Sequence, residues 1–245
     1  MNELEKFQLE VEENISNLGA DSELAQASQA WLEKSTPHRY TYNFRWMGRP
    51  IIQLPQDILA MQEIIWAVKP QVIVETGVAH GGSAIFYASM LELLGGNRKV
   101  IGVDIEIRPH NREAIESHPL HHRIELIEGS STDPSVVSKV HEMTEGLGPV
   151  LVTLDSNHTH EHVLKELRLY SPLVTKGSYL VVFDTVVEDM PDRFFENRPW
   201  KRGNSPKTAV REFLRENGRF QTDTSMDAKL MISVAPEGYL RCIED

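Results

Sequence analysis

From residue 70 onward, short apolar runs alternate with amphipathic stretches, and this alternation constrains the fold more than any other feature of the chain. Strand-like runs occur at residues 72–75, 100–103, 124–127, 150–154 and 179–183. Between them lie helical patterns at residues 83–94, 111–117, 134–144 and 161–170. Such an order predicts an α/β fold with a mostly parallel sheet and right-handed crossovers. In open sheets of this kind, small ligands bind beside the carboxyl ends of the strands.

The C-terminal part of the chain predicts a change of strand direction. A helical pattern at residues 206–216 is followed by two closely spaced apolar runs, at residues 229–234 and 239–243. The segment Ala-Pro-Glu-Gly separates the two runs, which is typical of a turn. We therefore expect a terminal antiparallel hairpin that brings the sheet to seven strands.

The first 54 residues predict N-terminal helices and a loop, ahead of an α/β domain over residues 55–245. One helix face carries an apolar stripe, which consists of Leu4, Phe7, Val11, Ile15 and Leu18. A second helix is expected over residues 22–34, with Ser22 as a possible cap. An apolar stripe needs a partner surface, either the core of the same chain or a second subunit. We favour the second, a homo-oligomer.

Composition limits the classes of partner. The chain has 245 residues and a formal net charge of −11, which disfavours nucleic acid as a main partner. No stretch is apolar for long enough to span a membrane, and the acidic N-terminus has no signal-peptide core. With Cys242 as the one cysteine, no internal disulfide can form. These features favour a cytoplasmic protein that binds a small-molecule substrate.

The first strand leads into the segment Glu75-Thr-Gly-Val-Ala-His-Gly-Gly-Ser83. Gly77 and Gly81 would let a ligand approach the backbone closely. The Ser83 hydroxyl and the free N–H groups of a helix start suit a carboxylate or phosphate. Glu75 would repel a phosphate but suits a cation. S-adenosylmethionine (SAM) carries both an ammonium and a carboxylate, whereas the glycine spacing also matches a relaxed dinucleotide fingerprint.

Polar residues also end the second and third strands. Asp104 could accept hydrogen bonds from both ribose hydroxyls of a nucleoside cofactor, or it could cap a helix. Ser130 lies in the short segment Gly-Ser-Ser and could face an adenine edge, although Gly-Ser is common in loops. Both positions are therefore candidates for cofactor binding.

The fourth and fifth strands end in Asp155 and Asp184. These strands should be neighbours, and two converging carboxylates without a cation would repel each other. A divalent metal is therefore expected, and Mg²⁺ prefers oxygen ligands. His158 and His160 with Asp184 could instead form an iron triad. Alternatively, Asp155 only caps a helix and the histidines are solvated.

Acidic residues at positions 188, 189 and 192 follow the fifth strand and could also reach a metal, or be solvated. Residues 192–207 then form a long segment rich in Pro, Gly, aromatic and basic residues. Long irregular loops of this kind are often functional. We interpret this one as a substrate lid, with an inert surface loop as the alternative.

These motifs together resemble those of the cephalosporin hydroxylase family, which has the class I methyltransferase fold and is related to metal-dependent sugar and macrolide O-methyltransferases. The similarity runs from about residue 44 to residue 241. It rests on the segments Trp46-Met-Gly-Arg-Pro-Ile-Ile-Gln-Leu-Pro-Gln-Asp57, Glu75-Thr-Gly-Val-Ala-His-Gly-Gly-Ser83, Leu154-Asp-Ser-Asn-His-Thr-His160 and Ser178-Tyr-Leu-Val-Val-Phe-Asp-Thr185.

The resemblance implies SAM near Glu75, Gly77, Ser83, Asp104 and Ser130. It also implies Mg²⁺ held partly by Asp155 and Asp184, and His158 as the candidate base. One residue departs from the pattern, because Phe183 stands where related metal-dependent members carry a glutamate. A phenylalanine cannot bind a cation, so the metal shell needs another ligand.

The sequence thus predicts a Rossmann-like, SAM-dependent O-methyltransferase that acts on a hydroxyl of a sugar or secondary metabolite. We predict His158 and Asp155 as catalytic residues and Asp155 and Asp184 as metal ligands. The predicted cofactor-binding residues are Glu75, Gly77, Gly81, Ser83, Asp104, Ser130 and Asp155. Two alternatives remain: a nicotinamide-dependent oxidoreductase, and a non-catalytic cofactor-binding partner in a biosynthetic pair.

Overall fold

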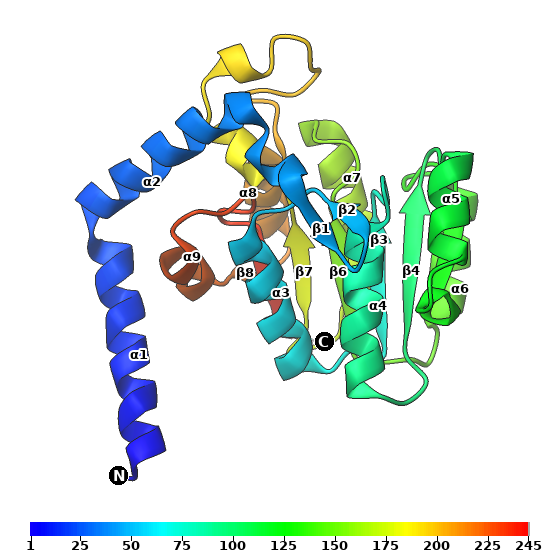
Figure 1. Cartoon of the computed structure of the whole chain (residues 1–245), viewed down its shortest axis with the longest axis horizontal. Coiled ribbons are helices and arrows are strands. Elements are labelled where there is room, and N and C mark those ends of the chain that lie inside the picture. The colour runs from blue at the N-terminus through cyan, green and yellow to red at the C-terminus, as the bar shows by residue number, and fades with distance from the viewer. Residues whose placement is uncertain (245) are drawn as a thin grey trace.

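The computed structural model describes residues 1–244 and contains a seven-stranded sheet in the order β5-β4-β3-β6-β7-β9-β8. Strands β3 to β7 are parallel, and their carboxyl ends lie at the upper edge of the sheet in Figure 1. Strand β9 is antiparallel to both β7 and β8. The strands are β3 (Val72–Thr76), β4 (Lys99–Asp104), β5 (Ile124–Glu128), β6 (Val150–Leu154), β7 (Tyr179–Val182), β8 (Phe220–Thr222) and β9 (Tyr239–Cys242). The predicted fold class is confirmed.

The predicted terminal hairpin is wrong in one strand. Residues 229–234 do not form a strand, and β9 pairs instead with β8, which precedes helix α9 (Thr224–Leu230). The side chain of Asp223 accepts a hydrogen bond from the Ser225 N–H and so starts this helix. The Val234 N–H donates to the Asp57 carboxylate and not to a strand. The Val234 N–H is therefore bonded to a side chain and is not available to a hairpin partner.

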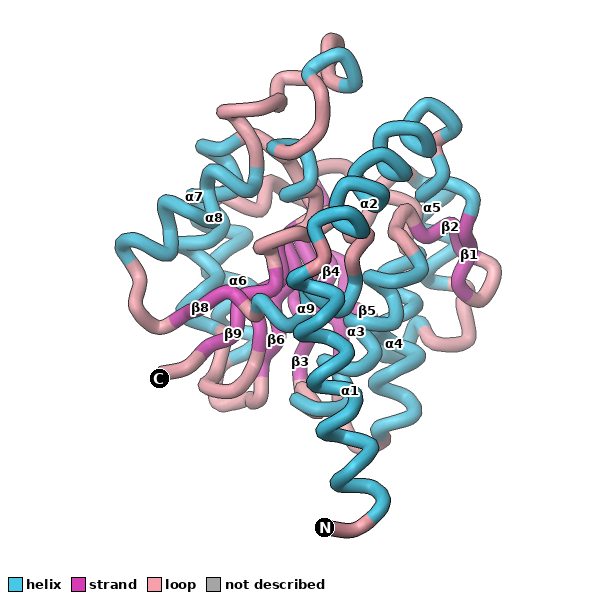
Figure 2. Tube along the Cα trace, turned by 90° about the vertical axis from the view of Figure 1, so that its left-hand side faces the viewer, coloured by secondary structure: helices cyan, strands magenta, loops and turns pink. Residues whose placement is uncertain are grey.

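Helices cover both faces of the sheet, as Figure 2 shows. Successive strand residues point to opposite faces, so Ile73 packs in the core under α3 (Pro55–Val68) and α4 (Gly82–Leu94). Val72 and Val74 pack on the other face. The helices on that face are α6 (Pro134–Thr144), α7 (His160–Tyr170) and α8 (Pro206–Glu216), while α5 (Pro109–Glu116) follows β4.

The N-terminal segment forms helices α1 (Glu3–Ala20) and α2 (Ser22–Ser35), as predicted. Asp21 caps α2 by accepting the N–H groups of Glu23 and Leu24, so the prediction of Ser22 as the cap is wrong. Ser22 is the first helical residue instead. The segment expected as a plain loop contains a small hairpin, of β1 (Phe44–Trp46) and β2 (Arg49–Ile51).

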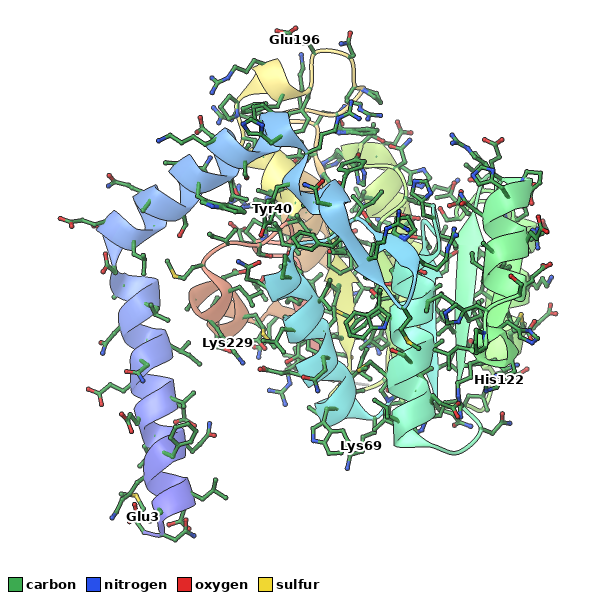
Figure 3. The ribbon with its side chains drawn as sticks, in the orientation of Figure 1. Glu3, Tyr40, Lys69, His122, Glu196 and Lys229 are labelled. Carbon is green, nitrogen blue, oxygen red and sulfur yellow. The ribbon has the colours of Figure 1, made fainter. Side chains whose placement is uncertain are left out.

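Helix α1 extends away from the sheet, and Glu3 lies at its far end (Figures 1 and 3). No residue of α1 is buried, and the side chains of Leu4 and Phe7 are 77% and 62% exposed. The core of this chain therefore leaves the outer half of the apolar stripe uncovered. Within residues 1–244, no helix combines the length and the apolar content that a membrane crossing requires.

Candidate active site

A cavity of about 1000 Å³ lies at the carboxyl ends of the parallel strands. It is lined by the loops that follow β3, β4 and β6, by the segment between β7 and α8, and by the end of α2. Of the predicted site residues, Gly77, Ser83, Asp104, Asp155, His158 and Asp184 line this cavity. Glu75, Gly81 and Ser130 lie outside its lining.

The two predicted glycines are required by the packing of the protein itself. Gly77 has a φ of +92°, and a Cβ atom there would lie 2.0 Å from the Asp155 carbonyl oxygen. Gly81 has a φ of +78°, and its Cβ would lie 2.4 Å from the Ile115 Cδ1. Both the backbone conformation and the available space thus exclude a side chain. This close packing brings the turn after β3 against the Asp155 backbone.

Glu75 lies behind the cavity wall and is only 2% exposed. Burial raises the pKa of Glu75 to about 8, the hydrogen bond with Ser83 lowers it, and the Asp104 charge raises it further. Within residues 1–244, the buried Oε2 atom has no hydrogen-bond partner. Buried acceptors are normally satisfied. Ser83 lines the cavity, and the Glu75 carboxyl group lies next to it. The unsatisfied Glu75 Oε2 therefore fits a ligand that brings a cationic N–H group.

Asp104 holds the turn after β3. Its Oδ2 accepts hydrogen bonds from the N–H groups of Val78 and Ala79, at 2.8 and 2.9 Å, and its Oδ1 accepts from Glu106. The carboxylate therefore organises the glycine loop as well as facing the cavity. Ser130 bonds to the hydroxyl of Thr132, at 3.2 Å.

Asp155, His158 and Asp184 come together, because β6 and β7 are adjacent parallel strands. One potential ligand atom from each of the three lies within 4.8 Å of those of the other two. The His158 Nε2 is 3.1 Å from the Asp184 Oδ2. Burial raises the pKa of Asp155 well above the usual carboxyl range, and the nearby charges of Asp184 and Glu75 raise it further. This excess of negative charge is what a cation would relieve.

Phe183 does not stand in the site. Its side chain is 3% exposed and packs in the core on the α3–α4 side of the sheet. Asp184 follows it in the left-handed conformation, with a φ of 55°, and turns into the cavity. Gln53 approaches the carboxylates from another direction, and its Nε2 donates to the Asp155 Oδ2 at 3.3 Å. The buried Gln53 Oε1 has no partner among the described residues.

The other two histidines lie elsewhere. The His160 Nδ1 is 2.8 Å from the Thr208 hydroxyl, and its Nε2 is 3.3 Å from Glu212. The His162 Nε2 is 3.1 Å from the hydroxyls of both Ser131 and Ser156. Because His160 contacts α8, the alternative of an iron triad of His158, His160 and Asp184 is not formed.

The additional acids after β7 do not join the candidate metal group either. Glu188 accepts hydrogen bonds from the Ser205 hydroxyl and the Gly203 N–H. Asp189 pairs with Lys207 at 2.5 Å. These contacts hold the segment after β7 against the start of α8.

Sequence reasoning did not single out Trp200, which lies in the long segment before α8. Its ring meets the His158 imidazole edge-on, with 4.7 Å between the ring centroids. Trp200 also lines the cavity, with Phe194 and Phe195 from the same segment. Contacts with α2 hold this segment in place, including an ion pair of 3.0 Å between Arg193 and Glu33. The segment lies above the sheet in Figure 1, and its role as a substrate lid stays a prediction.

Comparison with known proteins identifies the family. Residues 38–243 match the family described as Rhamnosyl O-methyltransferase/CmcI. A Rhamnosyl O-methyltransferase of Mycobacterium leprae (strain TN) is 31% identical over 199 residues, which cover 80% of this chain and 81% of that protein.

Solved structures of CmcI share the fold. Its apo form has a TM-score of 0.57 at 20% identity, over 83% of this chain and 78% of that one. The form described with Mg and SAM also has a TM-score of 0.57 at 20% identity, over 82% and 77% of the two chains. Together with the family match, these similarities confirm the predicted class of SAM-dependent O-methyltransferase. The chain belongs to the Rhamnosyl O-methyltransferase/CmcI family.

Proposed function

We propose that this protein transfers a methyl group from SAM to a hydroxyl of a sugar or a sugar-containing metabolite, with help from a divalent metal. The observation that carries this proposal is the meeting of Asp155, His158 and Asp184 in one cavity with the glycine loop. The names of the relatives add support for a sugar acceptor, because they describe methyl transfer to a rhamnosyl group.

Several residues in the cavity lining or just behind it fit SAM. The unsatisfied Glu75 Oε2 suits the ammonium, and Ser83 at the start of α4 suits the carboxylate. Asp104 would accept from the ribose, and Gly77 and Gly81 keep the turn tight. Ser130, in the loop after β5, is the candidate for the adenine. The bound cofactor would supply an electrophilic methyl group.

Asp155 and Asp184 would hold the metal as oxygen ligands, and Mg²⁺ suits such a pair. When bound, the metal would lower the pKa of the acceptor hydroxyl. His158 would take the proton of that hydroxyl. Its hydrogen-bond contact with Asp184 and its edge contact with Trp200 fix the orientation of the ring. Most of the rate gain would come from holding the oxygen in line with the methyl carbon.

Cofactor specificity tests the proposal against the nicotinamide alternative. S-adenosylhomocysteine, the product form of SAM, should raise the melting temperature, because a ligand that binds only the folded state stabilises it. NADH should leave the melting temperature unchanged, since Glu75 offers nothing to a phosphate. The measurement is a thermal unfolding series with each ligand. A shift with NADH and none with S-adenosylhomocysteine would assign the cavity to the oxidoreductase class.

Binding of S-adenosylhomocysteine should depend on pH through Glu75. Its pKa of about 8 means that Glu75 is mostly neutral below that pH in the free protein. An ammonium prefers the carboxylate, so binding at lower pH requires Glu75 to lose a proton. The Kd should therefore rise as the pH falls below about 8, by up to about tenfold per unit.

Isothermal titration calorimetry between pH 6.5 and 9 measures this dependence. The isosteric variant Glu75→Gln should bind more weakly at high pH and should lose the dependence. If the Kd of the unsubstituted protein does not change between pH 6.5 and 9, Glu75 does not bind the cofactor ammonium.

We also propose that residues 1–54 are a decoration of the methyltransferase domain and that α1 joins subunits of a homo-oligomer. The exposed side chains of Leu4 and Phe7 support this. Replacing both with glutamate should lower the mass measured by light scattering to that of a single chain. The matched control, Ser16→Glu with Asn17→Glu, adds the same charge at exposed positions outside the stripe. An unchanged mass after replacement of Leu4 and Phe7 would show that α1 does not join the subunits.

A further inference from the structure

Three arginines that line the cavity, Arg39, Arg108 and Arg198, have no acidic partner among residues 1–244, and two of them lie near an aromatic ring. Arg39 follows α2, and Arg198 lies in the segment before α8; both side chains are exposed and both line the cavity. Among residues 1–244, neither guanidinium takes part in an ion pair or a hydrogen bond. Each instead lies near an aromatic ring, at 5.8 Å from the Tyr42 centroid for Arg39 and 5.2 Å from the Trp200 centroid for Arg198. Such stacking orders a guanidinium but leaves its N–H edge available.

The chain has 36 acidic and 25 basic residues, so acidic partners are in excess. Arg193, in the same segment, stacks on Phe194 at 4.8 Å and also pairs with Glu33. Glu196, two residues before Arg198, lies at the outer end of the segment (Figure 3) and does not line the cavity. No local acid therefore neutralises Arg198.

The acids that line the cavity have other contacts. They are Asp104, which holds the glycine loop, and the pair Asp155 and Asp184 of the candidate metal group. The cavity lining thus contains both acidic side chains and arginines without acidic partners. A ligand that satisfies both needs a group for the metal end and an oxyanion for the arginines.

Trp200 connects the two kinds of side chain. The Arg198 guanidinium lies 5.2 Å from the centroid of its ring, and the ring meets the His158 imidazole at an interplanar angle of 88°, while His158 in turn meets Asp184. A sugar ring with a charged substituent, bound beside Trp200, would meet both the candidate base and Arg198. Tyr40 and Phe195, which line the same cavity, offer apolar surface to such a ring.

We propose that Arg39 and Arg198 select an acceptor that carries an oxyanion, a carboxylate or a phosphate, on or beside the methylated sugar ring. This inference rests on the proposed function, because it takes His158 as the reacting end of the acceptor site. Guanidinium groups stay charged at all relevant pH values and bind two oxygens of an oxyanion at once. A neutral sugar would leave both arginines without a partner.

The test measures binding of small sugars to the full chain loaded with S-adenosylhomocysteine and Mg²⁺. The probes are D-glucuronate, glucose 1-phosphate and the neutral methyl glucoside, with Kd values from ligand-observed NMR titrations. At least one anionic probe should bind about tenfold or more tightly than the neutral one. Comparison of the two anions distinguishes a carboxylate acceptor from a phosphate acceptor.

Arg39→Gln and Arg198→Gln should each weaken anion binding by about tenfold to a hundredfold, with no change in the Kd of S-adenosylhomocysteine. The matched control is Arg215→Gln, which removes an exposed arginine in the last turn of α8, outside the cavity lining, and should leave anion binding unchanged. Equal binding of neutral and anionic probes would overturn the inference. So would a loss of S-adenosylhomocysteine binding in either variant, since the arginine would then serve the cofactor. A protein that binds no S-adenosylhomocysteine even before substitution would instead overturn the proposed function.

Discussion

Replacing His158 with alanine is expected to lower kcat for methyl transfer by about 10²–10⁴, the usual loss for a general base. The His158 imidazole lies with Asp155 and Asp184 and lines the cavity. Its removal leaves the cofactor residues in place, so the Kd of S-adenosylhomocysteine should stay within about twofold. Steady-state methyl transfer and calorimetry measure the two quantities.

His160→Ala is the matched control for this prediction. His160 lies two residues further along but contacts Thr208 and Glu212, so its loss should affect stability more than turnover. Equal losses of kcat in the two variants, or full activity of His158→Ala, would remove His158 from the reaction.

Asp155→Asn should lower methyl transfer by about 10²-fold or more, because the acceptor oxygen loses its charge stabilisation. The same change should maintain or raise the melting temperature of the ligand-free protein. The reason is that burial, and to a lesser extent the neighbouring Asp184 and Glu75, already disfavours ionised Asp155, which its raised pKa reflects. Activity assays and thermal unfolding on one preparation separate these effects.

Chelation gives a second test of the same site. The metal should be weakly held, because Phe183 faces the core and leaves two carboxylates as the acidic ligands. Activity should therefore fall in excess EDTA and recover when Mg²⁺ is added. Full activity in excess EDTA would contradict a metal mechanism and leave a metal-free, base-catalysed transfer.

The parallel part of the fold could be predicted because its strands are apolar runs separated by long helices. Residues 150–154 and 134–144 match β6 and α6 as they occur in the structure. Strand β8 could not be found in this way, because it has three residues, of which only Phe220 is buried. The run at residues 229–234 looked like a strand, yet the buried carboxylate of Asp57 bonds to Ser233 and Val234 from a distant helix. Such a contact leaves no local trace in the sequence.

The candidate site could likewise be predicted from the sequence only in part. Asp155 and Asp184 could be paired in advance, since each ends one of two successive strands. The contact of Trp200 with His158 could not, because an irregular segment has no period from which to read its direction. The donation from Gln53 to Asp155 joins residues 102 positions apart. Gln53 lay within a segment that carries the family resemblance, which was the one available signal.

Transfer of an isotopically labelled methyl group to a sugar is the direct test of the proposed activity. The full chain is incubated with SAM labelled in its methyl group, Mg²⁺ and a panel of neutral and acidic sugars, and the products are analysed by mass spectrometry. We expect a sugar product that carries the label on an oxygen, formed in equal amount with S-adenosylhomocysteine and reduced about 10²-fold or more with Asp155→Asn. Binding of SAM with no labelled product from any sugar of the panel would contradict the proposed activity and favour a non-catalytic, cofactor-binding partner.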